Sequence, residues 1–248
     1  MKQFPMVLAL MTRRQTEDYV ALFAGLQQAM QVDGLPCQPE AFMLDFESAA
    51  WGAIRTCFAG VKIYGCGFHW ASCLQNKWKN LGLRPAVATN RPLKKLYGRV
   101  QALRFLPEEK IVPTFQRLKE LSGIYPEDHK IHSFMEYIEK TWVSTNTFPP
   151  ASWSQYNLTL RTNNDLEAWH RSFNKGFTRP TFYTFQEKMY QELMEAKDRI
   201  QGGDFRRRLA RTTIRNNETM EALWTTYEQD PTKQLSDVLD SIAALFGY

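Results

Sequence analysis

The chain has 248 residues, 44% of them hydrophobic, which is enough to bury a sizeable core in one large domain or two small ones. Its 31 Lys and Arg exceed its 26 Asp and Glu, so the net charge is +5 and nucleic acid is the natural polyanionic partner. No apolar run approaches the ~20 residues of a membrane-spanning helix, so no membrane partner is expected. Four cysteines without a secretory signal favour reduced thiols in a cytosolic or nuclear compartment.

The first part of the sequence alternates predicted strands and helices. Short continuous apolar runs predict strands that are buried on both faces, and apolar residues at helical spacing separate them. The strands are predicted over residues 4–13, 41–47 and 61–70, and the helices over 17–30 and 47–58. This order predicts an α/β fold with a parallel sheet and right-handed crossovers, in which functional groups gather at the carboxyl ends of the strands.

From Ala71 to about Trp142 the strand signals disappear, and the apolar spacing predicts successive helices. Prolines are expected to interrupt them at Pro85, Pro92, Pro107, Pro113 and Pro126. A polar loop over 144–157 then leads to a helix that begins near Asn164, and an amphipathic helix follows over 178–201.

The densest basic cluster of the chain comes after the amphipathic helix. In a complex with DNA these side chains would contact phosphates and fix no sequence, and otherwise they form a solvated helix face. The cluster consists of Arg206, Arg207, Arg208, Arg211 and Arg215.

Asp45 is the strongest single candidate for a functional carboxylate. It stands at the end of an apolar predicted strand, where neither burial nor amphipathicity calls for a charge. Two interpretations follow: the carboxylate binds a metal, or it caps the following helix.

Cys66 and His69 have the two-residue gap of a zinc ligand pair. A structural zinc site has four ligands, so His170 and Cys73 would have to complete the set through the fold. The alternative is a structural role, with a buried Cys and a hydrogen-bonded His at a tight glycine turn.

Glu167 and His170 lie three residues apart on the predicted helix, which places them on one face. Asn163 or Asn164 is suited to cap the start of this helix. The pair can share a metal, a proton or a ligand; the alternative is a solvated Glu beside a capping His.

Taken in order, four blocks of the sequence resemble the transposase domain of Mutator-like elements, the MULE family. The resemblance extends to about Arg179, and the blocks are PMVLALMTRRQTEDYVALFAGL, AFMLDFESAAWGAIRTCF, GCGFHWASCLQNKWKNLGL and RTNNDLEAWHRSFNKGF. It implies an RNase H-like (DDE-type) core with an α-helical insertion before the last catalytic helix. It also implies an Asp, Asp, Glu triad that holds two divalent ions, Mg²⁺ or Mn²⁺, for cleavage and joining of DNA strands.

By this resemblance Asp45 corresponds to the second aspartate of the triad and Glu167 to its glutamate, while Cys66 and His69 correspond to a Cys-x-x-His signature. The resemblance also implies a division of the chain. The divisions are a partial RNase H-like core over 1–70, the helical insertion over 71–158, a core helix with the last acidic residue over 159–180, and a C-terminal helical region with the basic cluster over 181–248.

The chain departs from the family pattern at its first aspartate. That residue belongs to an opening strand, which together with a second strand should precede Phe4, where only Met1, Lys2 and Gln3 stand. We therefore expect the first two strands to be missing. Since an exposed sheet edge is a site for pairing, self-association or a partner strand is expected to complete the sheet.

Our interpretation is a nuclear, DNA-binding MULE-type transposase fragment that is inactive as it stands. The alternative is a domesticated, non-catalytic nuclear module that binds DNA or protein. The modest net charge also leaves room for a helical scaffold without a nucleic-acid role.

Overall fold

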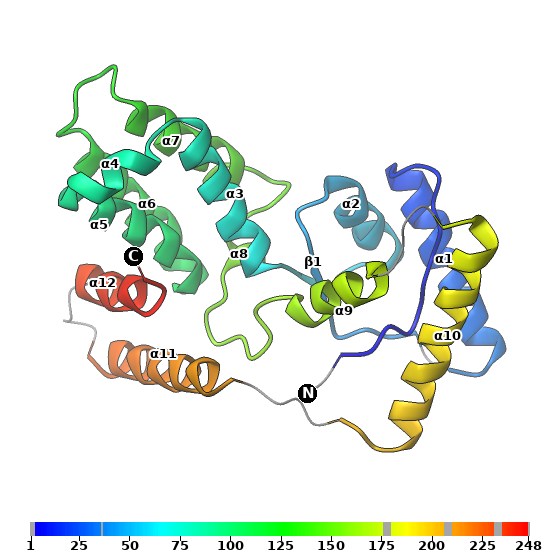
Figure 1. Cartoon of the computed structure of the whole chain (residues 1–248). Helices are drawn as coiled ribbons and strands as arrows, with labels where there is room; N and C mark the ends of the chain where they lie inside the picture. The colour runs from blue at the N-terminus through cyan, green and yellow to red at the C-terminus, as the bar shows by residue number, and fades with distance from the viewer. Residues whose placement is uncertain (1–2, 36, 176–179, 206–209, 231–234, 248) are drawn as a thin grey trace.

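The structure is a computed structural model that describes residues 3–35, 37–175, 180–205, 210–230 and 235–247. Within these residues the protein is mostly helical and contains a two-stranded parallel sheet. Figure 1 shows the short sheet among one group of helices, with a larger helical group at the opposite end of the molecule. The predicted α/β class is confirmed, with much less sheet than we expected.

The sheet is formed by β1 (Ala41–Leu44) and β2 (Lys62–Gly65), joined by the crossover helix α2 (Ser48–Cys57). Ala41 lies opposite Lys62 and Leu44 lies opposite Gly65. A parallel pair requires such a crossover, and α2 buries Trp51, Ala53 and Ile54 as its apolar spacing predicts. The carboxyl ends of both strands therefore meet at one edge.

The prediction of a strand over residues 4–13 is wrong. In the described part of the chain this segment pairs with no strand, and Met6 and Leu10 are 67% and 55% exposed. An apolar run becomes a buried strand only where a neighbouring strand takes up its backbone N–H and C=O groups. Neither β1 nor β2 takes that place, so the side chains stay open to solvent.

The third predicted strand, over 61–70, ends at Gly65, and α3 (Gly67–Asn80) begins directly after Cys66. The backbone N–H of Cys66 still donates to the carbonyl of Leu44 at 2.7 Å, and its own carbonyl then accepts from the N–H of Trp70. Trp70 begins a row of buried residues spaced by four, which favours the helix because the row packs on one face. His69 consequently lies in the first turn of α3.

The larger helical group contains the main hydrophobic core, which includes Trp70, Trp142 and Trp153. Four helices and two short helical turns continue the chain after α3. They are α4 (Arg84–Thr89), α5 (Arg91–Ala102), a 3₁₀ turn at Leu103–Phe105, α6 (Glu108–Ser122), α7 (Lys130–Ile138) and a π turn at Glu139–Val143. The predicted loop over 144–157 carries one more short helix, α8 (Pro150–Trp153).

Proline acts as expected at several helix starts. Pro85 and Pro92 lie in the first turns of α4 and α5, and Pro107 precedes α6. Pro113 contradicts the prediction because it lies inside α6. An internal proline costs ~3 kcal/mol, but α6 buries Ile111, Phe115 and Leu118, and each large apolar side chain contributes about 1.5–3 kcal/mol.

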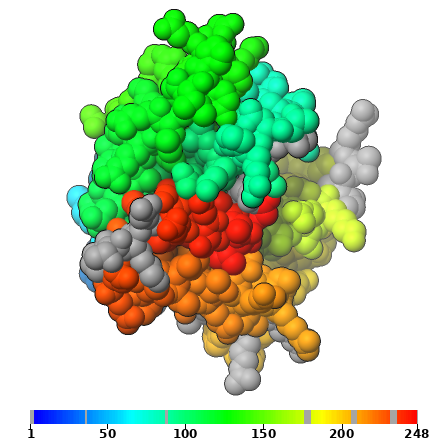
Figure 2. Space-filling view, turned by 90° about the vertical axis from the view of Figure 1, so that its left-hand side faces the viewer, coloured from blue at the N-terminus to red at the C-terminus, as the bar shows by residue number. Residues whose placement is uncertain are grey.

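The remaining helices flank these two groups. They are α1 (Thr16–Val32), α9 (Asn164–Asn174), α10 (Phe182–Gln201), α11 (Arg211–Gln229) and α12 (Leu235–Leu245). Helix α1 packs on α2, whereas α12 packs on α5 and α11 on α12. The space-filling view shows α11 and α12, in orange and red, against the green helices (Figure 2). None of the helices in the described ranges is long and apolar enough to cross a membrane.

A bidentate ion pair joins α12 to α5. Arg99 Nε and Nη2 donate to Oδ1 and Oδ2 of Asp240 at 2.7 and 2.9 Å, and Lys95 Nζ lies 2.9 Å from Oδ2. Burial by itself would raise the pKa of Asp240, but the hydrogen bonds from Arg99 and Lys95 outweigh it, and the net pKa lies below its ordinary value of 3.8. The ionised carboxylate is therefore favoured by folding.

We predict that Asp240→Asn lowers the free energy of unfolding by about 1 kcal/mol at pH 7, because the two charge-assisted bonds to Arg99 are weakened. A carboxylate with a depressed folded pKa stabilises fully above its unfolded pKa, and this stabilisation is lost as the pH falls through the folded pKa. Urea unfolding at several pH values should show the gap between wild type and variant closing below about pH 4. The exposed Asp33→Asn variant is the control, and a gap that is constant with pH would contradict the assignment.

Candidate metal centre

Asp45 directly follows β1, and the backbone around it is held by aromatic side chains. Its carbonyl accepts a hydrogen bond from Trp51 Nε1 at 2.7 Å. The ring of the next residue, Phe46, meets Trp142 edge-on at 4.7 Å and covers Gly65 so closely that a Cβ there would lie 2.2 Å from the ring. The main chain at Asp45 is thus fixed, while its carboxylate remains half exposed.

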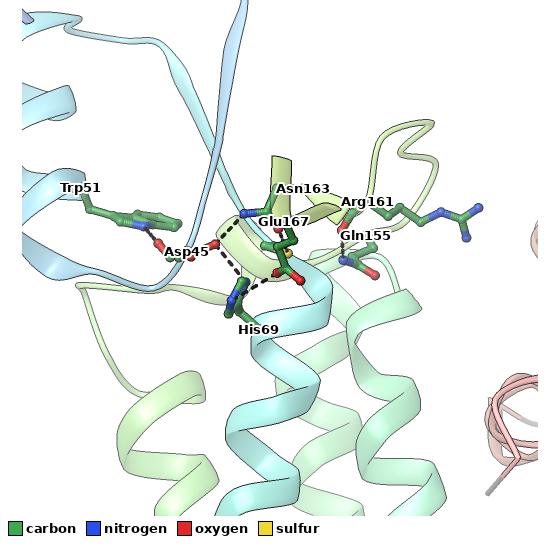
Figure 3. A network of polar contacts seen from close by, with 8 residues as sticks. Asp45, Trp51, His69, Gln155, Arg161, Asn163 and Glu167 are labelled. Carbon is green, nitrogen blue, oxygen red and sulfur yellow. Dashed lines mark hydrogen bonds and ion pairs between the residues drawn. The ribbon is translucent and has the colours of Figure 1, made fainter. Parts of the chain in front are cut away.

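The imidazole of His69 lies between two carboxylates from distant parts of the chain, as Figure 3 shows. Its Nδ1 is 2.9 Å from Asp45 Oδ1, and its Nε2 is 3.4 Å from Glu167 Oε1. His69 Nδ1 and Glu167 Oε1 are inaccessible to solvent, and neither atom has a partner at hydrogen-bonding geometry among the described residues. Buried polar atoms of this kind are rare without a strong partner, so both atoms are candidate ligands of a cation.

Asn163 adds a hydrogen-bonded link on the other side of Asp45. Its Nδ2 donates to Asp45 Oδ1 at 2.7 Å, and its Oδ1 accepts from the Sγ of Cys66 at 2.8 Å. Burial raises the pKa of the Cys66 thiol, which favours the protonated form that can donate this hydrogen bond. Cys66 and Asn163 are both buried, so the link is shielded from water.

The loop before α9 is pinned to the first turn of α3. The carbonyl of Arg161 accepts from the N–H of Gly67 at 3.0 Å and from Gln155 Nε2 at 2.7 Å. A Cβ at Gly67 would lie only 1.6 Å from Gln155 Nε2, so the close approach requires glycine. This contact brings α9, and Glu167 with it, to the end of the sheet.

Residues 1–72 match the family model of the MULE transposase domain. This match confirms the family resemblance for that part of the chain, and it contains β1, α2, β2, Asp45 and the pair Cys66 and His69. Glu167 lies beyond the matched residues. No curated protein and no solved structure matches the chain significantly.

The structure brings four of the predicted site residues together. Asp45, Cys66 and His69 each offer one ligand atom, and these atoms lie within 4.8 Å of one another. Glu167 joins this cluster through His69. The cluster spans the carboxyl ends of β1 and β2, the first turn of α3 and the first turn of α9.

His170 does not join the cluster. It is exposed one turn beyond Glu167 on α9, with its ring 4.9 Å from that of Trp169. Cys73 packs against the helical core instead. The structure therefore does not bring these two residues to Cys66 and His69, because sequence spacing along a helix did not reveal which turn faces the sheet.

The predicted basic cluster is only partly described. Arg206, Arg207 and Arg208 lie outside the described residues, whereas Arg211 and Arg215 are exposed at the start of α11. Their place on a helix surface is compatible with phosphate contacts and with a solvated face.

Three site residues were not recognised as such in the sequence. Asn163 was expected only as a helix cap, and Gln155 and Arg161 were assigned no role. The sequence offered one indication for Asn163, which is that it directly precedes the predicted helix containing Glu167. The polar loop gave no sign that Gln155 would be 2% exposed.

We predict that Gly67→Ala lowers the free energy of unfolding by about 1–3 kcal/mol, because the new methyl group must displace the buried Gln155 side chain. Thermal unfolding of the single variant and of Gly67→Ala combined with Gln155→Ala tests this clash. The double variant should be destabilised by less than the sum of the two single variants. Gly25→Ala, in an open position of α1, is the control and should be neutral or stabilising.

Proposed function

We propose that the chain carries the RNase H-like part of a MULE-type DNA transposase, whose acidic site binds a divalent metal and acts on DNA. One observation carries this proposal: Asp45, at the end of β1, and Glu167, in α9, meet across the imidazole of His69. In an α/β sheet the functional site usually lies at the carboxyl ends of the parallel strands, where Asp45 stands.

The order of the elements fits the proposed division of the chain. The β1–α2–β2 unit lies within the residues that match the MULE transposase domain, and the helical residues 71–158 separate it from α9. In this proposal residues 1–70 are the partial core, 71–158 the insertion, 159–180 the returning core helix and 181–248 a C-terminal helical region. In α9 the chain brings Glu167 to the end of the sheet.

The donor atoms suit a hard divalent ion. Two carboxylates favour Mg²⁺ or Mn²⁺. The Oε1 of Glu167 is inaccessible to solvent and accepts no hydrogen bond from the described residues, so it is available as a ligand. Cys66 and His69 would suit zinc, but the thiol of Cys66 already donates to Asn163. We propose Mg²⁺ or Mn²⁺ at Asp45 and Glu167. Zinc at Asp45, Cys66 and His69, whose ligand atoms lie within 4.8 Å of one another, is the alternative.

A divalent metal in this site supplies Lewis-acid stabilisation to a phosphodiester. The residues of the chain hold the site in place: Asp45 and Glu167 provide the charge, while His69 keeps an N–H within reach of either carboxylate. Two carboxylates suit one metal better than the pair of ions used in two-metal strand transfer. We propose that this chain alone binds metal and DNA without completing strand transfer.

We predict that Asp45→Asn and Glu167→Gln each weaken Mn²⁺ binding at least tenfold, which corresponds to about 1.4 kcal/mol. Both substitutions keep the shape of the side chain but remove the charge that binds the metal. Isothermal titration calorimetry measures the affinity, with the exposed Glu120→Gln variant as the control. Unchanged titrations in both variants would remove the metal from Asp45 and Glu167.

The second candidate function is a non-catalytic, nuclear DNA-binding module derived from a transposase. The exposed Arg211 and Arg215 at the start of α11 favour it, as does the net charge of +5. For this non-catalytic module, Asp45→Asn and Glu167→Gln should leave DNA affinity unchanged. For the metal-dependent function, DNA affinity should fall in both variants and should require Mn²⁺.

For either function we predict that the affinity for duplex DNA falls steeply with added salt, because arginines that bind phosphates release counterions from the DNA. The double variant Arg211→Ala with Arg215→Ala should flatten the plot of log affinity against log salt by about 2. Fluorescence anisotropy at several salt concentrations gives this slope. The matched control is the double variant Arg91→Ala with Arg117→Ala, which changes exposed arginines of α5 and α6. Equal slopes for the two double variants would exclude a DNA contact by α11.

A further inference from the structure

Asn163 contacts both acidic residues of the site through different groups. Its side-chain Nδ2 donates to Asp45 Oδ1 at 2.7 Å, and its backbone carbonyl accepts from the N–H of Glu167 at 3.1 Å. Asp45 and Asn163 are separated by 118 residues in the sequence. One residue therefore fixes the carboxylate at the end of β1 and also the first turn of the helix that carries Glu167.

The direction of the Asn163 amide is set by its two neighbours. Its Oδ1 accepts the hydrogen bond from Cys66 Sγ, so its NH₂ group must face Asp45. The reverse orientation would place the amide oxygen against the carboxylate, which is repulsive, and would leave the thiol to act only as a weak acceptor for the NH₂ group. Asn163 is only 8% exposed, so water cannot compensate for a wrong orientation.

Asp45 retains one carboxylate oxygen for an external ligand. Asn163 and His69 both approach Oδ1, and no hydrogen bond from the described residues reaches Oδ2. Half of the Asp45 side chain is exposed, so the carboxylate is accessible to an external ligand. A hydrogen bond to one oxygen restricts rotation of the carboxylate and presents the other oxygen in a defined direction.

We infer that Asn163 is a positioning residue of the acidic site, and that Cys66 acts through it as a hydrogen-bond donor rather than as a metal ligand. Asn163 orients Asp45 and sets the start of α9, and the thiol keeps its amide in the required direction. The part of this inference that concerns metal affinity rests on the proposed function, whereas the link between Asp45 and Asn163 exists without a metal.

The first experiment measures this link in metal-free protein. Urea unfolding in the presence of a chelator is compared for Asp45→Ala, Asn163→Ala and the double variant. We expect the double variant to lose less stability than the sum of the two single losses, because each substitution already removes the shared hydrogen bond. The same cycle with Asn164→Ala, an exposed neighbour, should be additive. Additivity for Asn163 as well would overturn the inference.

The second experiment measures Mn²⁺ affinity by electron paramagnetic resonance of the free ion. Loss of a residue that orients a ligand typically weakens metal binding about 10–100-fold, and we expect this range for Asn163→Ala. Cys66→Ser keeps a hydrogen-bond donor and should bind Mn²⁺ like wild type, whereas Cys66→Ala should weaken binding. Equal losses in Cys66→Ser and Cys66→Ala would overturn the donor role of the thiol.

The two experiments separate the failure of the inference from that of the proposed function. If wild type binds no Mn²⁺, the proposed metal function fails, and the unfolding cycle alone decides whether Asn163 holds Asp45. If Asn163→Ala does not fold, the two Cys66 variants still decide the role of the amide, because Cys66→Ala removes the bond that orients it while Cys66→Ser keeps that bond.

Discussion

The hydrogen bond between the amide of Asn163 and the carboxylate of Asp45 is the contact on which the acidic site depends. It connects the end of β1 with the loop that starts α9, two segments that no continuous secondary structure joins. The backbone bonds from Gly67 to Arg161 and from Glu167 to Asn163 extend this connection to α3 and to the next helical turn. Together these bonds hold Glu167 at the end of the sheet.

Packing is distributed unequally around this site. The main core lies in the larger helical group, where Trp70 of α3 stacks with Trp153 at 5.0 Å. On the other side α1 buries none of its residues, and the two strands are mostly half-buried. The acidic residues therefore lie where a well-packed helical body meets a thin α/β layer. Helix α3 belongs to both, and this gives His69 a rigid base.

This arrangement explains how the acidic site can be held by a small sheet. Asp45 is restrained by the bond from Trp51 and by the packing of Phe46, whereas His69 is restrained by the helix that carries Trp70. The MULE transposase domain match covers these elements but not α9. The position of Glu167 thus depends on contacts made by the loop before it, which explains why Asn163 has such weight in the proposed site.

Several features of the protein follow from the sequence by itself. The apolar spacing determined α1, α2 and most later helices, and the alternation of short apolar runs with helices identified β1 and β2. Asp45 was a candidate because a charge at the end of an apolar strand is unusual, and the resemblance of the family blocks supported Glu167, Cys66 and His69.

Other features were decided only by tertiary structure. Residues 4–13 have the composition of a strand but lack a pairing partner among the described residues, since strand formation depends on a neighbour and not on composition. Pro113 stays inside α6 because burial outweighs its local cost. His170 turns away from Cys66, and Asn163 becomes the link between the acids, because contacts between distant segments depend on how the helices pack and leave no mark in local spacing.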